Sequence, residues 1–254
     1  MPRTTAILAI IYFFLVEAVI IMYSRPGAVS ISPKQAAGKT APVFVEEKKA
    51  PDYSGEKIVY DVKMGGIKIG TSTFMHREKT ILDGKQAHLV EFTTKVVKIN
   101  DTETIWADTK DFLPMRIQRD VRMWPKYERI TEDYDQVLYT IDITKTAGGS
   151  TEKKRIKKQG PIHNAILLPF QLRLLEDLRP GWSMKITLPQ QDYQMTLKSL
   201  EDIEVPAGKF RSFYLESDPK RFSIWISADD KRIPLKIVGA NGLNYTLSMR
   251  SYSK

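Results

Sequence analysis

The sequence predicts an all-β fold: an antiparallel meander forming a curled sheet, a half-barrel or a barrel with one short helix, preceded by an N-terminal transmembrane or signal helix. Two observations support the β domain. From Tyr53 onward, apolar and polar residues alternate with period two, and turn dipeptides separate the alternating runs. These dipeptides are Gly65-Gly66, Asp83-Gly84, Gly148-Gly149 and Asn241-Gly242. They tolerate the positive φ of tight hairpin turns, so residues 53–254 are predicted to be a single antiparallel domain.

The predicted strands have one apolar face each. In the first of them Ile58, Tyr60, Val62 and Met64 alternate with polar neighbours, and longer runs of the same kind follow in residues 104–144. Such strands indicate one sheet curled around its own core, or two sheets face to face. No succession of β-α-β units is present, so a parallel nucleotide-binding sheet is not expected.

One segment departs from the alternation. After Asn164, a predicted N-cap, apolar residues continue as a helix to Leu178, Pro169 is expected to kink that helix, and Arg179-Pro180-Gly181 ends it. This helix either packs across the open end of the barrel as a structural element or acts as a movable lid over an apolar cavity. The candidate lid or pocket residues are Ile166, Leu167, Phe170, Leu174 and Leu178.

Residues 6–23 are apolar except for Glu17, and 18 helical residues reach about 27 Å, enough for a bilayer core. Residues 1–23 are therefore predicted to be a membrane anchor or a signal segment. The weak processing site at Ala28-Val29-Ser30 favours a retained anchor over a cleaved signal peptide. Residues 24–52 contain four prolines and no periodicity, and they are predicted to be a flexible linker.

The formal net charge is +9, which favours anionic partners such as lipid headgroups or lipopolysaccharide phosphates. Nucleic acid is not an expected partner, because no nucleic-acid-binding motif accompanies the charge. The densest basic run either protects an exposed strand from edge-to-edge aggregation or contacts an anionic surface. Its residues are Lys153, Lys154, Arg155, Lys157 and Lys158.

No catalytic, metal-binding or cofactor-binding residue is predicted, and we expect a non-enzymatic protein. The chain has no cysteine, and its three histidines stand in unrelated contexts, so each is expected to be a surface or hydrogen-bonded polar residue. The carboxylate pairs Asp101/Glu103 and Glu132/Asp133 are expected not to converge locally. Known nucleophile and phosphate-binding motifs are missing from the sequence.

Several segments resemble one known family in order and spacing. They are residues 55–60 (GEKIVY), 66–70 (GIKIG), 178–181 (LRPG), 204–210 (EVPAGKF) and 224–234 (IWISADDKRIP). In these segments the chain resembles the domain-of-unknown-function family 3108, a group of exported bacterial proteins. The resemblance implies a β-barrel or half-barrel akin to lipoprotein-carrier and lipocalin-like envelope proteins, and it implies no reaction.

These observations lead to two hypotheses about function. In the first, the β domain binds or carries a lipid or another hydrophobic or anionic envelope component. In the second, the protein is a membrane-tethered scaffold or assembly factor that contacts other envelope proteins. The expected location is the bacterial cell envelope, with residues 6–23 in the inner membrane and the β domain in the periplasm. The alternative is secretion to the periplasm after cleavage.

Overall fold

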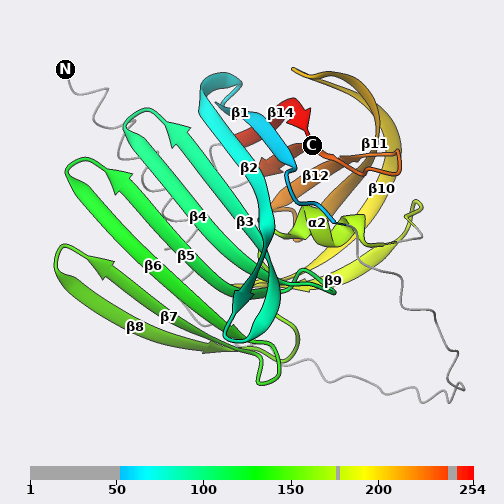
Figure 1. The fold of residues 1–254 in the computed structure, drawn as a ribbon. Coiled ribbons are helices and arrows are strands. Elements are labelled where there is room, and N and C mark those ends of the chain that lie inside the picture. The colour runs from blue at the N-terminus through cyan, green and yellow to red at the C-terminus, as the bar shows by residue number, and fades with distance from the viewer. Residues whose placement is uncertain (1–51, 176–177, 240–244) are drawn as a thin grey trace, which may run out of the picture. The chain divides into compact units, whose positions relative to one another are not determined.

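The structure, a computed structural model, describes residues 52–175, 178–239 and 245–254, which belong to one compact unit. They form a 14-stranded antiparallel sheet and one short helix, so the predicted all-β meander is confirmed (Figure 1). The elements are β1 (Lys57–Met64), β2 (Ile67–Leu82), β3 (Lys85–Val96), β4 (Ile99–Asp108), β5 (Pro114–Met123), β6 (Lys126–Asp135), β7 (Thr140–Ala147), β8 (Ser150–Lys157), α2 (Leu168–Arg173), β9 (Ser183–Thr187), β10 (Asp192–Val205), β11 (Gly208–Asp218), β12 (Phe222–Ser227), β13 (Pro234–Gly239) and β14 (Tyr245–Ser253).

Some predictions concern residues outside these described ranges. The predicted anchor or signal segment, the predicted linker up to residue 51 and the Asn241-Gly242 turn lie outside the described residues. Among the residues that are described, no helix is long and apolar enough to cross a membrane.

The first and last strands pair in the middle of the sheet. The strand order is β8-β7-β6-β5-β4-β3-β2-β1-β14-β13-β12-β11-β10-β9, with every pair antiparallel. The two edges, β8 and β9, are therefore consecutive strands of the chain and do not pair with each other. A connector, residues 158–182, joins these edges and contains α2, so the curled sheet is unclosed.

Tight two-residue turns set the register of three hairpins. Gly65-Gly66, Asp83-Gly84 and Gly148-Gly149 each have positive φ at both positions, between 48° and 83°. The registers Met64↔Ile67, Leu82↔Lys85 and Ala147↔Ser150 follow directly. These turns confirm the sequence prediction, because the type I′ geometry that suits strand twist needs positive φ at both central residues.

The helix α2 is shorter than predicted. It has six residues, all buried, and Pro169 occupies its first turn, where a missing N–H costs no hydrogen bond. The predicted kink at Pro169 is therefore wrong. Asn164 is not the N-cap either: its Oδ1 accepts hydrogen bonds from the backbone N–H groups of Ile166 (2.8 Å) and Leu167 (3.2 Å), forming a turn ahead of the helix.

The helix packs into an apolar core made by strands β9–β12, which we call the C-terminal arm of the sheet. Leu168 and Leu172 of α2 join buried side chains of β9–β12, among them Ile186, Leu197 and Leu215, which are all fully buried. Leu178 belongs to the same core. Burying a Leu or Ile side chain stabilises a fold by roughly 1.5–3 kcal/mol, so this core holds the connector against the sheet.

A buried ion pair fixes the other side of α2. Arg173 donates to both carboxylate oxygens of Glu56, just before β1, at 2.5 and 2.8 Å, and the two side chains are 4% and 1% exposed. Tyr252 of β14 also donates to Glu56 (3.1 Å), and the Arg173 guanidinium lies 4.1 Å from the Tyr53 ring centroid. This bidentate ion pair, with the hydrogen bond from Tyr252, connects α2 to the start of β1 and to β14 at the centre of the sheet.

We expect Arg173→Met to lower the free energy of unfolding by about 3–5 kcal/mol, because it leaves the Glu56 carboxylate buried without its partner. The double variant Glu56→Leu/Arg173→Met should recover much of this loss. Denaturant unfolding followed by tryptophan fluorescence measures both changes. The control is Arg155→Met, which removes a similar two-bonded pair with Asp142 on the exposed surface and should have little effect. Equal effects of the two single variants would contradict the prediction.

Candidate functional site

A cavity of about 650 Å³ lies between the connector, the strand β9 and the loop that joins β4 to β5. Its apolar wall consists of Leu174 and Leu175 at the end of α2, Met184 of β9 and Leu113 of the β4–β5 loop. Its size falls within the range of small-molecule sites. The cavity therefore forms at the seam between the two unpaired edges of the sheet.

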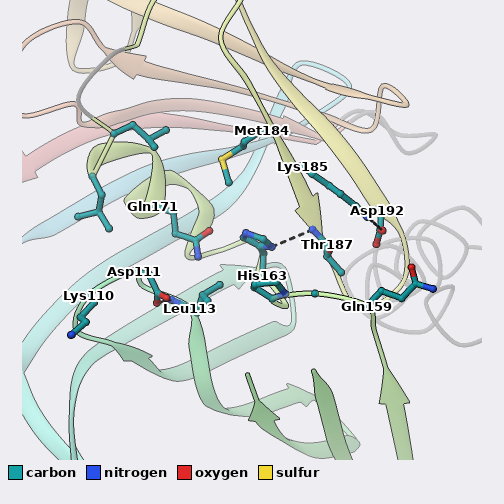
Figure 2. Close-up of a pocket in the computed structure, with 14 residues that line it drawn as sticks. Lys110, Asp111, Leu113, Gln159, His163, Gln171, Met184, Lys185, Thr187 and Asp192 are labelled. Atoms are coloured by element: carbon teal, nitrogen blue, oxygen red, sulfur yellow. Dashed lines mark hydrogen bonds and ion pairs between the residues drawn. The ribbon is translucent and has the colours of Figure 1, made fainter. Parts of the chain in front are cut away.

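Polar groups converge on the same cavity. Figure 2 shows the side chains of Gln171 and His163 directed toward its centre. Gln171 donates from Nε2 to the carbonyl of Phe112 (3.2 Å), whereas its buried Oε1 accepts no hydrogen bond from the described residues. A buried carbonyl oxygen without a donor is unfavourable, so Gln171 supplies an acceptor that a bound hydroxyl, amide or water could satisfy.

The connector is fastened to β9 by His163. Its backbone N–H donates to the carbonyl of Thr187 (2.8 Å), and the Thr187 N–H donates back to His163 Nδ1 (3.2 Å). Burial lowers the pKa of His163, which keeps the imidazole neutral and Nδ1 free to accept. The sequence prediction of a hydrogen-bonded histidine is confirmed here.

A second fastening holds the connector to the β6–β7 loop. Gln136 donates from Nε2 to the carbonyls of Ile162 (2.9 Å) and Pro114 (3.0 Å), and its Oε1 accepts from the Ile162 N–H (2.9 Å). One amide side chain thus joins three segments beside the cavity.

The rim of the cavity is charged. Lys185 lies 2.8 Å from Asp192, and Lys158 lies 3.7 Å from the same carboxylate (Figure 2 draws the first pair). Lys110 and Asp111 line the cavity from the β4–β5 loop, and burial raises the pKa of Asp111. The cavity is thus amphipathic, with an apolar wall under a rim of both charges.

An aromatic cluster fills the space on the opposite side of α2. Phe170 packs against His76 at 4.5 Å between ring centroids, and Phe112 stacks on His88 at 4.1 Å. Tyr53 and Phe74 complete the cluster. Gln171, which lines the cavity, donates to the carbonyl of Phe112, so the aromatic cluster adjoins the amphipathic space.

The structure buries His76 and His88, so a surface position is wrong for both, whereas a hydrogen bond with the backbone of Thr109 agrees with the predicted hydrogen-bonded role of His88. Both are 2% exposed, and neither Nε2 has a hydrogen-bond partner in the described part of the chain. Burial lowers the pKa of His76 to about 3, with repulsion from His88 and Arg173 adding to the shift, and burial also lowers the pKa of His88. Both rings are therefore neutral near pH 7 and serve as aromatic packing groups.

The structure also corrects the prediction that Asp101 and Glu103 do not converge. Arg119 of β5 lies 2.5 Å from Asp101 and 3.6 Å from Glu103, because residues two apart on β4 share one face. Glu132 of β6 interacts with the same guanidinium, and burial raises the pKa of Glu103 to about 8 although Arg119 opposes the shift. The i, i+2 spacing of the two carboxylates was the signal for this cluster. Within the described ranges, no group of three or more potential ligands could hold a metal ion.

The candidate lid residues lie in different environments in the structure. Leu174 lines the cavity, whereas Leu167 and Phe170 are fully buried and Leu178 belongs to the C-terminal core. Ile166 is half-buried in the turn before α2. Their role as a lid or pocket stays a prediction.

The basic run forms the edge strand β8 and the residue after it. Lys153, Arg155 and Lys157 lie on one face of the strand, while Lys154 lies on the other beside Ile143. Lys158 is half-buried and pairs with Asp192, which lines the cavity. The alternation divides the five charges among three environments, so they do not make one surface.

Comparison with known proteins identifies the family. A family model described as "Protein of unknown function (DUF3108)" matches residues 59–247. The chain belongs to the DUF3108 family. The match includes every described strand except part of the two central ones, and it confirms the family that the sequence resembles.

Two solved structures are similar to this DUF3108 chain. One is a β-barrel-like protein of the domain of unknown function DUF1849 from Brucella abortus, with 7% identity, a TM-score of 0.49, and coverage of 79% of this chain and 97% of that one. The other is a candidate exported protein with a YmcC-like fold from Bacteroides fragilis, with 7% identity, a TM-score of 0.30, and coverage of 80% and 98%. A search of curated proteins found no match.

We expect acid to destabilise the protein through His76. Its pKa is below the unfolded-state value near 6.5, so the unfolded chain binds the proton first, and stability falls as the pH drops from 6.5 toward 3. Between pH 6.5 and 5 the loss should be about 2 kcal/mol relative to His76→Leu, measured by denaturant unfolding at each pH. The control Phe74→Leu loosens the same cluster without removing a titrating group, and its pH profile should parallel that of the natural protein. Parallel profiles for His76→Leu as well would refute this assignment.

Proposed function

We propose that this DUF3108 protein is a non-enzymatic envelope protein whose β domain binds an amphipathic lipid or a similar hydrophobic component in the seam cavity. The observation that carries the proposal is the wall of Leu113, Leu174, Leu175 and Met184 beside the unsatisfied Gln171 acceptor. Apolar walls with a few placed polar groups are typical of small-molecule sites. The aliphatic part of the ligand would lie on the leucines.

The charged rim supports the choice of an amphipathic ligand. Lys110 and Lys185 would face an anionic headgroup such as a phosphate, although Asp111 and Asp192 balance part of their charge. A lipid or a lipopolysaccharide component has both the chain and the phosphate that this arrangement favours. The net charge of +9 favours the same class of ligand.

The proposed location is the bacterial cell envelope. Residues 6–23 would hold the protein in the inner membrane with the β domain in the periplasm, or the domain would be released there after cleavage. The apolar length of the segment supports this proposal.

The alternative is a scaffold that contacts other envelope proteins. It is favoured by one observation: β8 is an edge of the sheet, where another chain could add a strand. The lysines of β8 weaken this alternative, because charged edge strands resist such pairing.

The test is lipid extraction and mass spectrometry of the full chain purified in mild detergent. We expect about one amphipathic molecule per chain, and Leu174→Trp should weaken its binding by about 5- to 150-fold, because overfilling a packed site costs on the order of 1–3 kcal/mol. Leu200→Trp is the matched control: Leu200 lies on β10 and does not line the cavity.

Met184→Trp, on β9, is a second variant that should block the cavity. Thermal unfolding checks that all three variants fold. Equal ligand content in the blocked and control variants would overturn the cavity assignment. A chain that carries no lipid and co-purifies with specific protein partners would support the scaffold instead.

A further inference from the structure

Three hairpin ends on one side of the sheet combine exposed apolar side chains with basic residues. The ends of β1–β2, β3–β4 and β5–β6 each expose large apolar side chains: Ile67 is 71% exposed, Val97 59%, and Trp124 89% with Tyr127 43%. The opposite ends of the strands also expose apolar residues, Ile81 (65%) and Val137 (85%), but those lie near Asp83 and Asp135, so the charge around the residues distinguishes the two sides rather than their exposure. We call Ile67, Val97 and Trp124, with residues 63–68, 95–98 and 122–127 around them, the tip row.

The register places the tip row along one side of the molecule. Gly70 of β2 pairs with Val96 of β3, and Ile99 of β4 pairs with Met123 of β5, so the three ends lie at neighbouring positions. Figure 1 shows these hairpin ends in sequence along one side of the sheet. Successive ends are two strands apart, about 10 Å, so the row extends over about 20 Å.

The charges of the tip row have one sign. Its three segments contain six basic residues and no acidic one. Lys95, Lys98 and Arg122 are exposed, whereas Lys68 lies 3.1 Å from Asp61, which also pairs with Arg250. Asp120, the acidic residue just inside the β5 end, is paired with Arg129 at 2.9 Å. The row therefore presents a positive field with an apolar side chain at each tip.

We propose that the tip row is a membrane-contact site that inserts Ile67, Val97 and Trp124 into the interfacial region of an anionic bilayer. Tryptophan favours this region because its ring is apolar and its N–H is polar, and flanking lysines are attracted to anionic headgroups. A protein partner fits less well, because the centres of protein interfaces are depleted in lysine and these apolar residues stand apart from one another. The site is independent of the seam cavity and of the function proposed for it.

The absence of cysteine permits a direct test in the full chain. Single variants Ile67→Cys, Val97→Cys and Trp124→Cys would each carry an environment-sensitive fluorophore on protein reconstituted into vesicles. The vesicles would contain phosphatidylcholine alone, or equal parts of phosphatidylcholine and phosphatidylglycerol, with and without spin-labelled lipid as a quencher. The matched control is Leu138→Cys in the β6–β7 loop, at the opposite ends of the strands, where Leu138 is 63% exposed.

We expect blue-shifted emission and quenching by spin-labelled lipid at all three tips in the anionic vesicles, and neither at position 138. Adding Lys95→Gln and Lys98→Gln should lower the equilibrium constant for contact between the tips and the bilayer by about fivefold for each charge removed. High salt should also lower it, because salt screens the attraction to anionic headgroups. Thermal unfolding checks each variant, and the exposed positions should tolerate the change.

Two outcomes would overturn the proposal. Tip labels that stay unquenched, or a control label quenched equally, would show that the row does not contact lipid. A blue shift that increases with protein density, without quenching by spin-labelled lipid, would assign the row to contacts between protein molecules. Because the measurement follows the tips alone, membrane insertion of residues 6–23 cannot produce the expected pattern.

Discussion

The pairing of β1 with β14 is the constraint on which the rest of the structure depends. It joins Lys57 to Ser253 and Met64 to Tyr245, close to the two ends of the described domain. Because the chain's terminal strands meet in the middle of the sheet, both unpaired edges belong to consecutive strands, β8 and β9. A single connector must then cross from one edge to the other, and the seam, α2 and the cavity all result from that crossing.

Two different interactions hold the connector in place. Leu168 and Leu172 bury apolar area in the core of the C-terminal arm, which is favourable but weakly directional. The Glu56–Arg173 pair is directional, because a planar guanidinium and a carboxylate meet in one geometry. Desolvation offsets much of its attraction, so its main effect is to select the position of α2 relative to β1 and β14. That position also decides which side of α2 faces the aromatic cluster and which faces the cavity.

The sequence predicted the local structure better than the site. Dipeptides such as Gly65-Gly66 and Asp83-Gly84 specify turn geometry within a few residues, so hairpins and the fold class could be recognised. The burial of His76 and His88 could not be recognised, because it depends on Phe170 of the connector and Phe112 of the β4–β5 loop, which meet the two histidines only in the folded sheet. Arg119 is intermediate: the spacing of Asp101 and Glu103 placed both carboxylates on one face, but pairing with β5 supplied the cation.

Hairpin connectivity relates the cavity to the tip row. Successive connections in a meander lie at alternate ends of the strands, so the β4–β5 loop that lines the cavity is at the opposite end of β4 from the tip that carries Val97. A ten-residue strand is about 33 Å long. A bilayer in contact with the tip row would thus lie about one strand length from Leu113. A ligand in the cavity would then exchange with the aqueous side or with a partner facing it, because the bilayer itself would be out of reach.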